Sequence, residues 1–253
     1  MFYDLQKASL LKRASAWLLD MILLCILVVG VASLMSGLLK YDSYYDTLNA
    51  CKEKYEAQYG VSFEITEEDY KAKSPEEQAI YDEALAAMNA DEDALKAYNM
   101  LINLSLVIVT ISVLAACLVL EFAVPLLFGN GQTVGKKVFG LAIVRVNCVK
   151  VDGVCMFIRS ILGKYTIETM VPVMLVIMVV WNILGIVGPV VIALLGLLQL
   201  ILLFATQNHS VIHDCLANTV VVDLHSQMIF GSESELIDYK KRIHEDLVNR
   251  SSY

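Results

Sequence analysis

Residues 165–206 read YTIETMVPVMLVIMVVWNILGIVGPVVIALLGLLQLILLFAT, a stretch with no Lys or Arg and with Glu168 as its only acid. As one helix it would be about 63 Å long, twice the ~30 Å thickness of the hydrocarbon core of a bilayer. We therefore expect two spans, roughly 167–185 and 189–206, joined by a tight uncharged turn. The residues that favour a turn there are Gly185, Gly188 and Pro189.

Two other apolar runs, Ala14–Leu39 and Leu101–Phe128, are each long enough to cross a bilayer, which takes about 20 helical residues. The composition agrees, because 57% of the residues are hydrophobic and 18% are charged, against ~25% charged in soluble domains. The first run is longer than the ~7–15 apolar residues of a cleavable signal peptide and contains Asp20, so we interpret it as a retained span. The sequence predicts an all-α membrane protein, a four-span helical bundle.

Basic residues predict the orientation of the spans. Segments 1–13 and 129–164 are net basic, whereas segment 40–100 contains 15 acidic and 6 basic residues. Because Lys and Arg accumulate in cytoplasmic loops, we expect a multi-pass protein of the cell membrane with both termini in the cytoplasm. The expected segments are the N-terminus and first span (1–39), an acidic extracytoplasmic insertion (40–100), the second span (101–128), a cytoplasmic loop (129–166), the third and fourth spans (167–206) and a cytoplasmic tail (207–253).

The extracytoplasmic insertion has the pattern of a small helical domain. Two capping boxes are expected in it, Thr66 with Asp69 and Ser74 with Glu77. Its acidic residues are interpreted either as a solvated surface or as a vestibule that gathers cations or docks a partner.

The cytoplasmic loop and tail have shorter elements. VFGLAIVRV and CVKVDGV predict a β-like hairpin with Asp152–Gly153 as a turn, and MFIRSILGKY predicts an amphipathic helix at the inner interface. The tail predicts a helix with Ser234 as a possible cap and one apolar stripe, made of Leu236, Ile243 and Leu247.

Acidic residues inside the spans are the candidate functional groups. A charge near the bilayer centre costs about 2.5–3.5 kcal/mol on insertion scales, so Asp20, Glu121 and Glu168 should face the bundle interior and have partners. The bases expected to flank them at the inner surface are Arg13, Arg159 and Lys164. The acids either fix helix packing through ion pairs or form a cation or proton site. Pro125 favours the second reading, because it frees a backbone carbonyl that an ion can coordinate.

Three motifs carry a family resemblance. RASAWLLD heads the first span, GQTVGKKVFGLAIVRV follows the second, and HDCLANTVVV follows the last. In this order they resemble the RDD family of bacterial membrane proteins, over residues 8–40 and 115–223. The resemblance implies that the family's arginine and two aspartates are Arg13, Asp20 and Asp214. It also assigns a motif loop, made of Gly131, Gln132, Thr133, Gly135 and Lys136. Some family members are reported to act in cation/proton exchange.

Two other motifs are rejected. GQTVGKK departs from a phosphate loop, because only three residues separate its glycines and Lys137 stands where Ser or Thr would bind magnesium. A turn that places Lys136 and Lys137 against anionic lipid is the simpler interpretation. His213 and Asp214 have no accompanying nucleophile motif, so we expect Asp214 to cap the bundle and to pair with Arg13.

Two functions follow from these features. The first is transport of small cations or protons through Asp20 and Glu121, in a homo-oligomer because four spans are few for a carrier. The alternative is a non-enzymatic membrane scaffold or accessory subunit that binds a partner membrane protein through its insertion or tail. We expect no enzymatic activity, cofactor or nucleic-acid partner, and no metal site, since the six cysteines have no zinc-ligand spacing.

Overall fold

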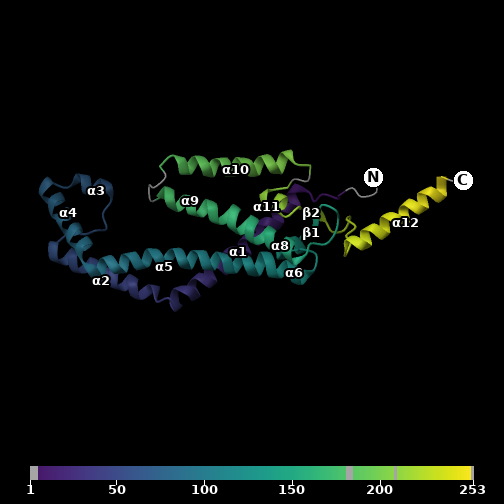
Figure 1. Ribbon diagram of the computed structural model, residues 1–253. Helices are drawn as coiled ribbons and strands as arrows, with labels where there is room; N and C mark the ends of the chain where they lie inside the picture. Colours follow the sequence, from purple (N-terminus) through teal and green to yellow (C-terminus); the bar gives the residue numbers. More distant parts are fainter. Residues whose placement is uncertain (1–4, 181–184, 208–209, 252–253) are drawn as a thin grey trace. The chain divides into compact units, whose positions relative to one another are not determined.

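The computed structural model describes residues 5–180, 185–207 and 210–251 (Figure 1). The chain forms two compact parts, one made of Met1–Val28 with Val113–Tyr253 and the other of Val29–Ser112. The elements in chain order are α1 (Leu10–Leu38), α2 (Tyr41–Tyr59), α3 (Glu67–Ala72), α4 (Pro75–Ala90), α5 (Glu92–Cys117), the π-helical η1 (Leu118–Ala123), α6 (Val124–Phe128), α7 (Val134–Val138), β1 (Leu141–Arg145), α8 (Gly153–Phe157), the π-helical η2 (Ile158–Met170), α9 (Val171–Val180), α10 (Val187–Ala205), α11 (Ile212–Leu216), β2 (Thr219–Asp223) and α12 (Glu233–Ser251).

Four apolar helices in the described part of the chain are long enough to cross a membrane, which confirms the predicted fold class. They are Leu10–Leu38, Glu92–Phe128, Gly153–Val180 and Val187–Ala205. The predicted turn between the last two is right only at Gly185, whose φ of 50° is left-handed. Gly188 and Pro189 instead lie in the first turn of α10, where proline is tolerated because its missing N–H has no helical partner. Residues 181–184, which the predicted third span includes, lie outside the described residues.

The third apolar helix begins well before the predicted span. The expected interfacial helix and the third span form one continuous helix from Gly153. The predicted turn at Asp152–Gly153 is wrong, because Asp152 is the N-cap of α8 and accepts a 2.9 Å hydrogen bond from the Cys155 backbone N–H.

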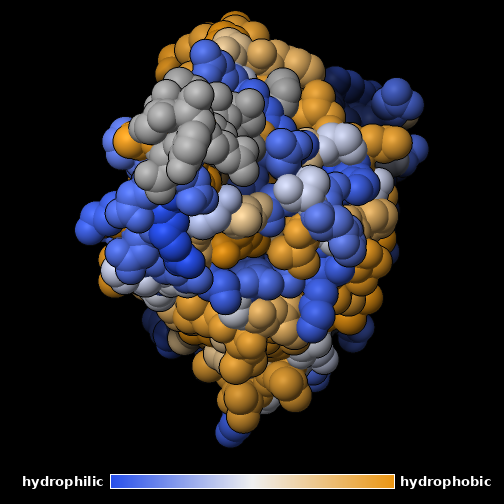
Figure 2. All heavy atoms as spheres, turned by 90° about the vertical axis from the view of Figure 1, so that its right-hand side faces the viewer, coloured by the Kyte–Doolittle hydropathy of each residue, from blue (hydrophilic) through white to orange (hydrophobic). Residues whose placement is uncertain are grey.

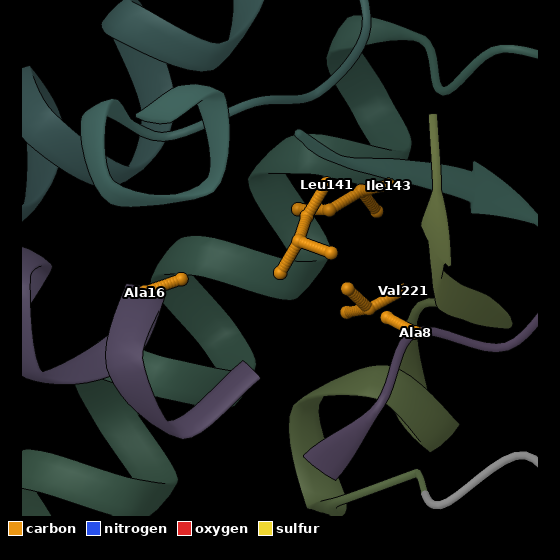
Figure 3. Packing of buried hydrophobic residues seen from close by; sticks show 5 residues of the cluster. All are labelled: Ala8, Ala16, Leu141, Ile143 and Val221. Carbon is orange, nitrogen blue, oxygen red and sulfur yellow. The ribbon is translucent and has the colours of Figure 1, made fainter. Parts of the chain in front are cut away.

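The two strands come from distant segments. β1 pairs antiparallel with β2, with Leu141 opposite Asp223 and Arg145 opposite Thr219. The segment predicted to be the hairpin partner of β1 forms one bridge with it in the described residues, Val144 to Lys150, and a second bridge with Phe230 through Val149. The sheet formed by β1 and β2 is buried on both faces. Leu141, Ile143 and Val221 pack with Ala8 and Ala16 on one face (Figure 3), and the other face buries Ala142, Val144, Val220 and Val222.

The part made of residues 29–112 contains both predicted capping boxes, which the structure confirms at Thr66 and Ser74. Asp91 lies between the end of α4 and the start of α5. Its carboxylate accepts hydrogen bonds from the backbone N–H groups of Asp93 and Ala94 and from the Tyr55 hydroxyl. Chiefly through the bond from Ala94, these donors lower the pKa of Asp91 to about 2, so it stays charged at neutral pH.

The C-terminal helix α12 is anchored at its start. Ser232 caps it, in place of the predicted Ser234, by accepting from the Glu235 N–H at 3.3 Å. Leu236 packs with Cys148 and Phe230, whereas Leu247 is exposed. Figure 2 views the molecule from the side that carries β1, β2 and α12, where hydrophilic residues cross the centre and hydrophobic residues lie mainly above and below them.

Candidate functional site: a buried ionic network

Asp20 is held by the motif loop. It is buried on α1 and is 6% exposed. Its Oδ1 accepts from the Gly135 backbone N–H at 2.7 Å, and its Oδ2 accepts from the Thr133 hydroxyl at 2.5 Å. Lys136 Nζ lies 3.6 Å from the same Oδ2. The charge in this apolar helix is therefore met by the first turn of α7, at which Thr133 is the N-cap.

The rest of the motif loop fixes this turn against β1. Gly131 has a φ of 62°, and a Cβ there would lie 2.8 Å from Val151 Cγ2, so glycine is required. The buried Gln132 amide donates to the Leu141 carbonyl at 2.6 Å. Lys136, expected together with Lys137 at anionic lipid, has its Nζ directed inward, where it donates to the Thr133 hydroxyl at 3.2 Å.

Asp214 is shared by two arginines. It lies on α11 and is 1% exposed. Its carboxylate accepts from Arg159 and lies 3.4 Å from Arg13 Nη2, which confirms the predicted pairing with Arg13. Arg159 also donates to the Thr219 hydroxyl at 2.5 Å, so it is buried rather than at the surface as predicted. Burial by itself would raise the pKa of Asp214, but Arg159, His213 and Arg13 hold it below its usual value.

Glu121 pairs with Lys164 across the helices η1 and η2. Its backbone carbonyl lies four residues before Pro125, in the π-helical η1, where the Val124 N–H donates to the carbonyl five residues earlier. The Ser160 hydroxyl donates to this carbonyl at 2.5 Å. The carbonyl that the sequence suggested as an ion ligand is therefore already occupied by a protein donor.

Ser160→Ala is expected to destabilise the protein by about 1–3 kcal/mol, because the Glu121 carbonyl is then buried without this donor. The free energy of unfolding in detergent measures this cost. A loss below about 0.5 kcal/mol would show that the Ser160 hydroxyl does not serve this carbonyl.

Glu168 and His213 form a second acid–base pair. His213 Nδ1 lies 2.7 Å from Glu168 Oε2, and the His213 backbone N–H donates to Oε1 at 3.0 Å. The close packing of η2 on α11 depends on Gly163, where a Cβ would lie 2.6 Å from His213 Cβ. Burial, and then Arg159, lower the pKa of His213, which favours the neutral imidazole.

These groups surround a cavity of about 500 Å³. Its charged and polar lining consists of Arg13, Lys136, Arg159, Lys164, Glu168, Gln199, His213 and Asp214. Asp20 and Glu121 lie behind this lining, each bonded to one of its lysines. Within the described ranges, no three His, Cys, Asp or Glu side chains are grouped as metal ligands would be.

The structure thus divides the predicted site residues into separate pairs. Arg13 joins Asp214, whereas Asp20 joins the motif loop and Glu121 joins Lys164. Sequence reasoning missed the Ser160 hydroxyl, which donates to Glu121, and the Thr219 hydroxyl, which accepts from Arg159, because no local pattern gives a signal for either.

Comparison with known proteins agrees with the motifs. The model of the RDD family matches residues 7–218, a range that contains the arginine, both aspartates and the motif loop. No curated protein and no solved structure matches the chain. A family model that covers most of the chain, together with these motifs and four apolar helices, shows that this multi-pass membrane protein belongs to the RDD family.

Proposed function

We propose that this protein exchanges protons for small cations across the cell membrane, with both termini in the cytoplasm. The observation that carries the proposal is the cavity of about 500 Å³ that brings Glu168 and His213 together at the end of the spans. Histidine is the side chain whose ordinary pKa, about 6.5, lies nearest neutrality, and a carboxylate beside it can accept its proton. Buried polar groups of this kind mark proton relays in membrane proteins.

We propose an exchange site at Glu168 and His213 rather than at Asp20 and Glu121. Asp20 receives hydrogen bonds from Thr133 and Gly135, and Glu121 is paired with Lys164. Releasing either carboxylate to bind a cation would break these contacts. We therefore assign them to packing and orientation, and assign proton exchange to Glu168 and His213. Because four spans are few for a carrier, the active form is proposed to be a homo-oligomer.

Glu168→Gln is expected to abolish cation-dependent proton movement, because the amide oxygen can still accept a hydrogen bond from His213 but the amide cannot take up a proton. Proteoliposomes that contain a pH-sensitive dye would receive pulses of sodium, potassium or lithium. Glu92→Gln is the matched control, since its side chain is 85% exposed and pairs only at the surface with Lys96. Dye responses equal to those of protein-free liposomes for the wild type would overturn the proposal.

A non-enzymatic scaffold or accessory subunit is the second candidate. The observation that favours it is the exposed apolar side of α12, where Ile237 is 50%, Leu247 is 44% and Val248 is 47% exposed. A helix anchored at its first turn with apolar residues beyond it can present them to a partner membrane protein. Co-purification that requires Leu247 and Val248, in a protein without ion flux, would favour this function.

A further inference from the structure

The cavity combines a charged base with an apolar mouth. Its lining includes Trp17 of α1 and Leu200 and Phe204 of α10, which are 53%, 55% and 67% exposed. These residues lie in the first turns of one span and the last turns of another. The mouth therefore opens on the lipid-facing surface near the ends of the spans, at the level where tryptophan and lipid headgroups meet.

The base of the cavity is rich in positive charge. Arg13 and Arg159 both bind Asp214, so two guanidinium groups share one carboxylate. Lys136 and Lys164 also line the cavity, whereas their carboxylate partners do not. The lining contains four cations, Arg13, Lys136, Arg159 and Lys164, and two carboxylates, Glu168 and Asp214. An anion inside the cavity meets mainly N–H donors. The carboxylates that pair with Lys136 and Lys164, those of Asp20 and Glu121, lie outside the lining.

We propose that this cavity binds the phosphate of an anionic phospholipid, with its acyl chains along Trp17, Leu200 and Phe204. Basic pockets between transmembrane helices bind anionic headgroups in this way. A volume of about 500 Å³ suits a headgroup rather than a single ion. The apolar, exposed mouth favours a lipid over a soluble phosphate, which would gain nothing from these side chains. This cavity is also the one that contains Glu168 and His213, but lipid binding can be tested whether or not the protein transports ions.

The test is binding of short-chain phosphatidylglycerol to the full chain in neutral detergent, measured by native mass spectrometry. Phosphatidylcholine with the same chains tests the charge, and glycerol phosphate tests the need for the chains. We expect phosphatidylglycerol to bind at least tenfold more tightly than either. Equal binding of phosphatidylcholine would overturn the charged site, and equal binding of glycerol phosphate would overturn the lipid as its occupant.

Two matched pairs of variants locate the site. Ala14 lines the cavity, so Ala14→Leu should fill it and weaken binding at least tenfold without removing a charge. Ala193→Leu makes the same change at an exposed position of α10 outside the lining and should bind normally. Lys136→Gln should weaken binding, whereas Lys137→Gln should not, because Lys137 lies 3.7 Å from the centre of the Phe128 ring. Wild-type binding by Ala14→Leu would overturn the proposal, even if Lys136→Gln fails to fold.

Discussion

Asp214→Ala is expected to lower the free energy of unfolding by about 3–5 kcal/mol, the cost of removing one partner from a buried ion pair. Asp214 is 1% exposed, and its carboxylate is the shared partner of Arg159 and Arg13. Its loss leaves two guanidinium groups close together without this carboxylate between them. The measurement is unfolding in mixed detergent micelles, with the amount of protein in the membrane fraction as a second readout.

Asp223→Ala is the matched control for this change. Asp223 also pairs with a basic residue of the N-terminal segment, since Lys12 Nζ lies 2.6 Å from its Oδ2. The Lys12 side chain is 46% exposed, however, and such surface pairs contribute below about 1 kcal/mol. Similar losses in both variants would contradict the special role of Asp214.

Exchanging the charges of Arg13 and Asp214 is not expected to restore stability. Arg159 would then face a second arginine at the position of Asp214, because it binds the same carboxylate in the wild type. Recovery in the double variant Arg13→Asp with Asp214→Arg would mean that Arg159 contributes little to this cluster.

Gly135→Ala is expected to destabilise the protein by about 3 kcal/mol or more, because its added Cβ makes a closer contact than one at Gly131 or Gly163 would make. A Cβ at this position would lie 2.2 Å from the Ala16 carbonyl oxygen and 2.8 Å from Asp20 Oδ1. The clash is with backbone of α1, so α7 must move away. The movement would also break the hydrogen bond from the Gly135 N–H to the Asp20 carboxylate. The loss of this bond therefore adds to the free-energy cost of overpacking.

Gly153→Ala separates this effect from the general cost of replacing glycine in a helix. Gly153 also lies in the first turn of a helix, and a Cβ there would meet no atom within 4 Å. Its free energy of unfolding should stay within about 0.5 kcal/mol of the wild type. If Gly135→Ala unfolds like Gly153→Ala, the close contact between α7 and α1 is not needed for stability.

Local features of this chain could be predicted from its sequence. The four apolar helices follow from run length, because a bilayer requires about 20 apolar helical residues and satisfies no exposed backbone group. The capping boxes at Thr66 and Ser74 follow from residues three positions apart. The family could be recognised because its motifs are short and keep their order. Arg13 and Asp214 could be paired because both are expected at the same ends of the spans.

Only the tertiary structure decided which distant groups meet. The partner of β1 is β2 rather than the adjacent segment, because β2 offers a second strand that is buried on both faces. The charge of Asp20 is met by the Gly135 N–H, 115 residues away, and the Glu121 carbonyl is met by the Ser160 hydroxyl. Spacing along a helix predicts which face a side chain occupies but not which donor from another helix reaches it. Which donor reaches a side chain depends on how closely the helices pack, as where Gly135 allows α7 to approach α1.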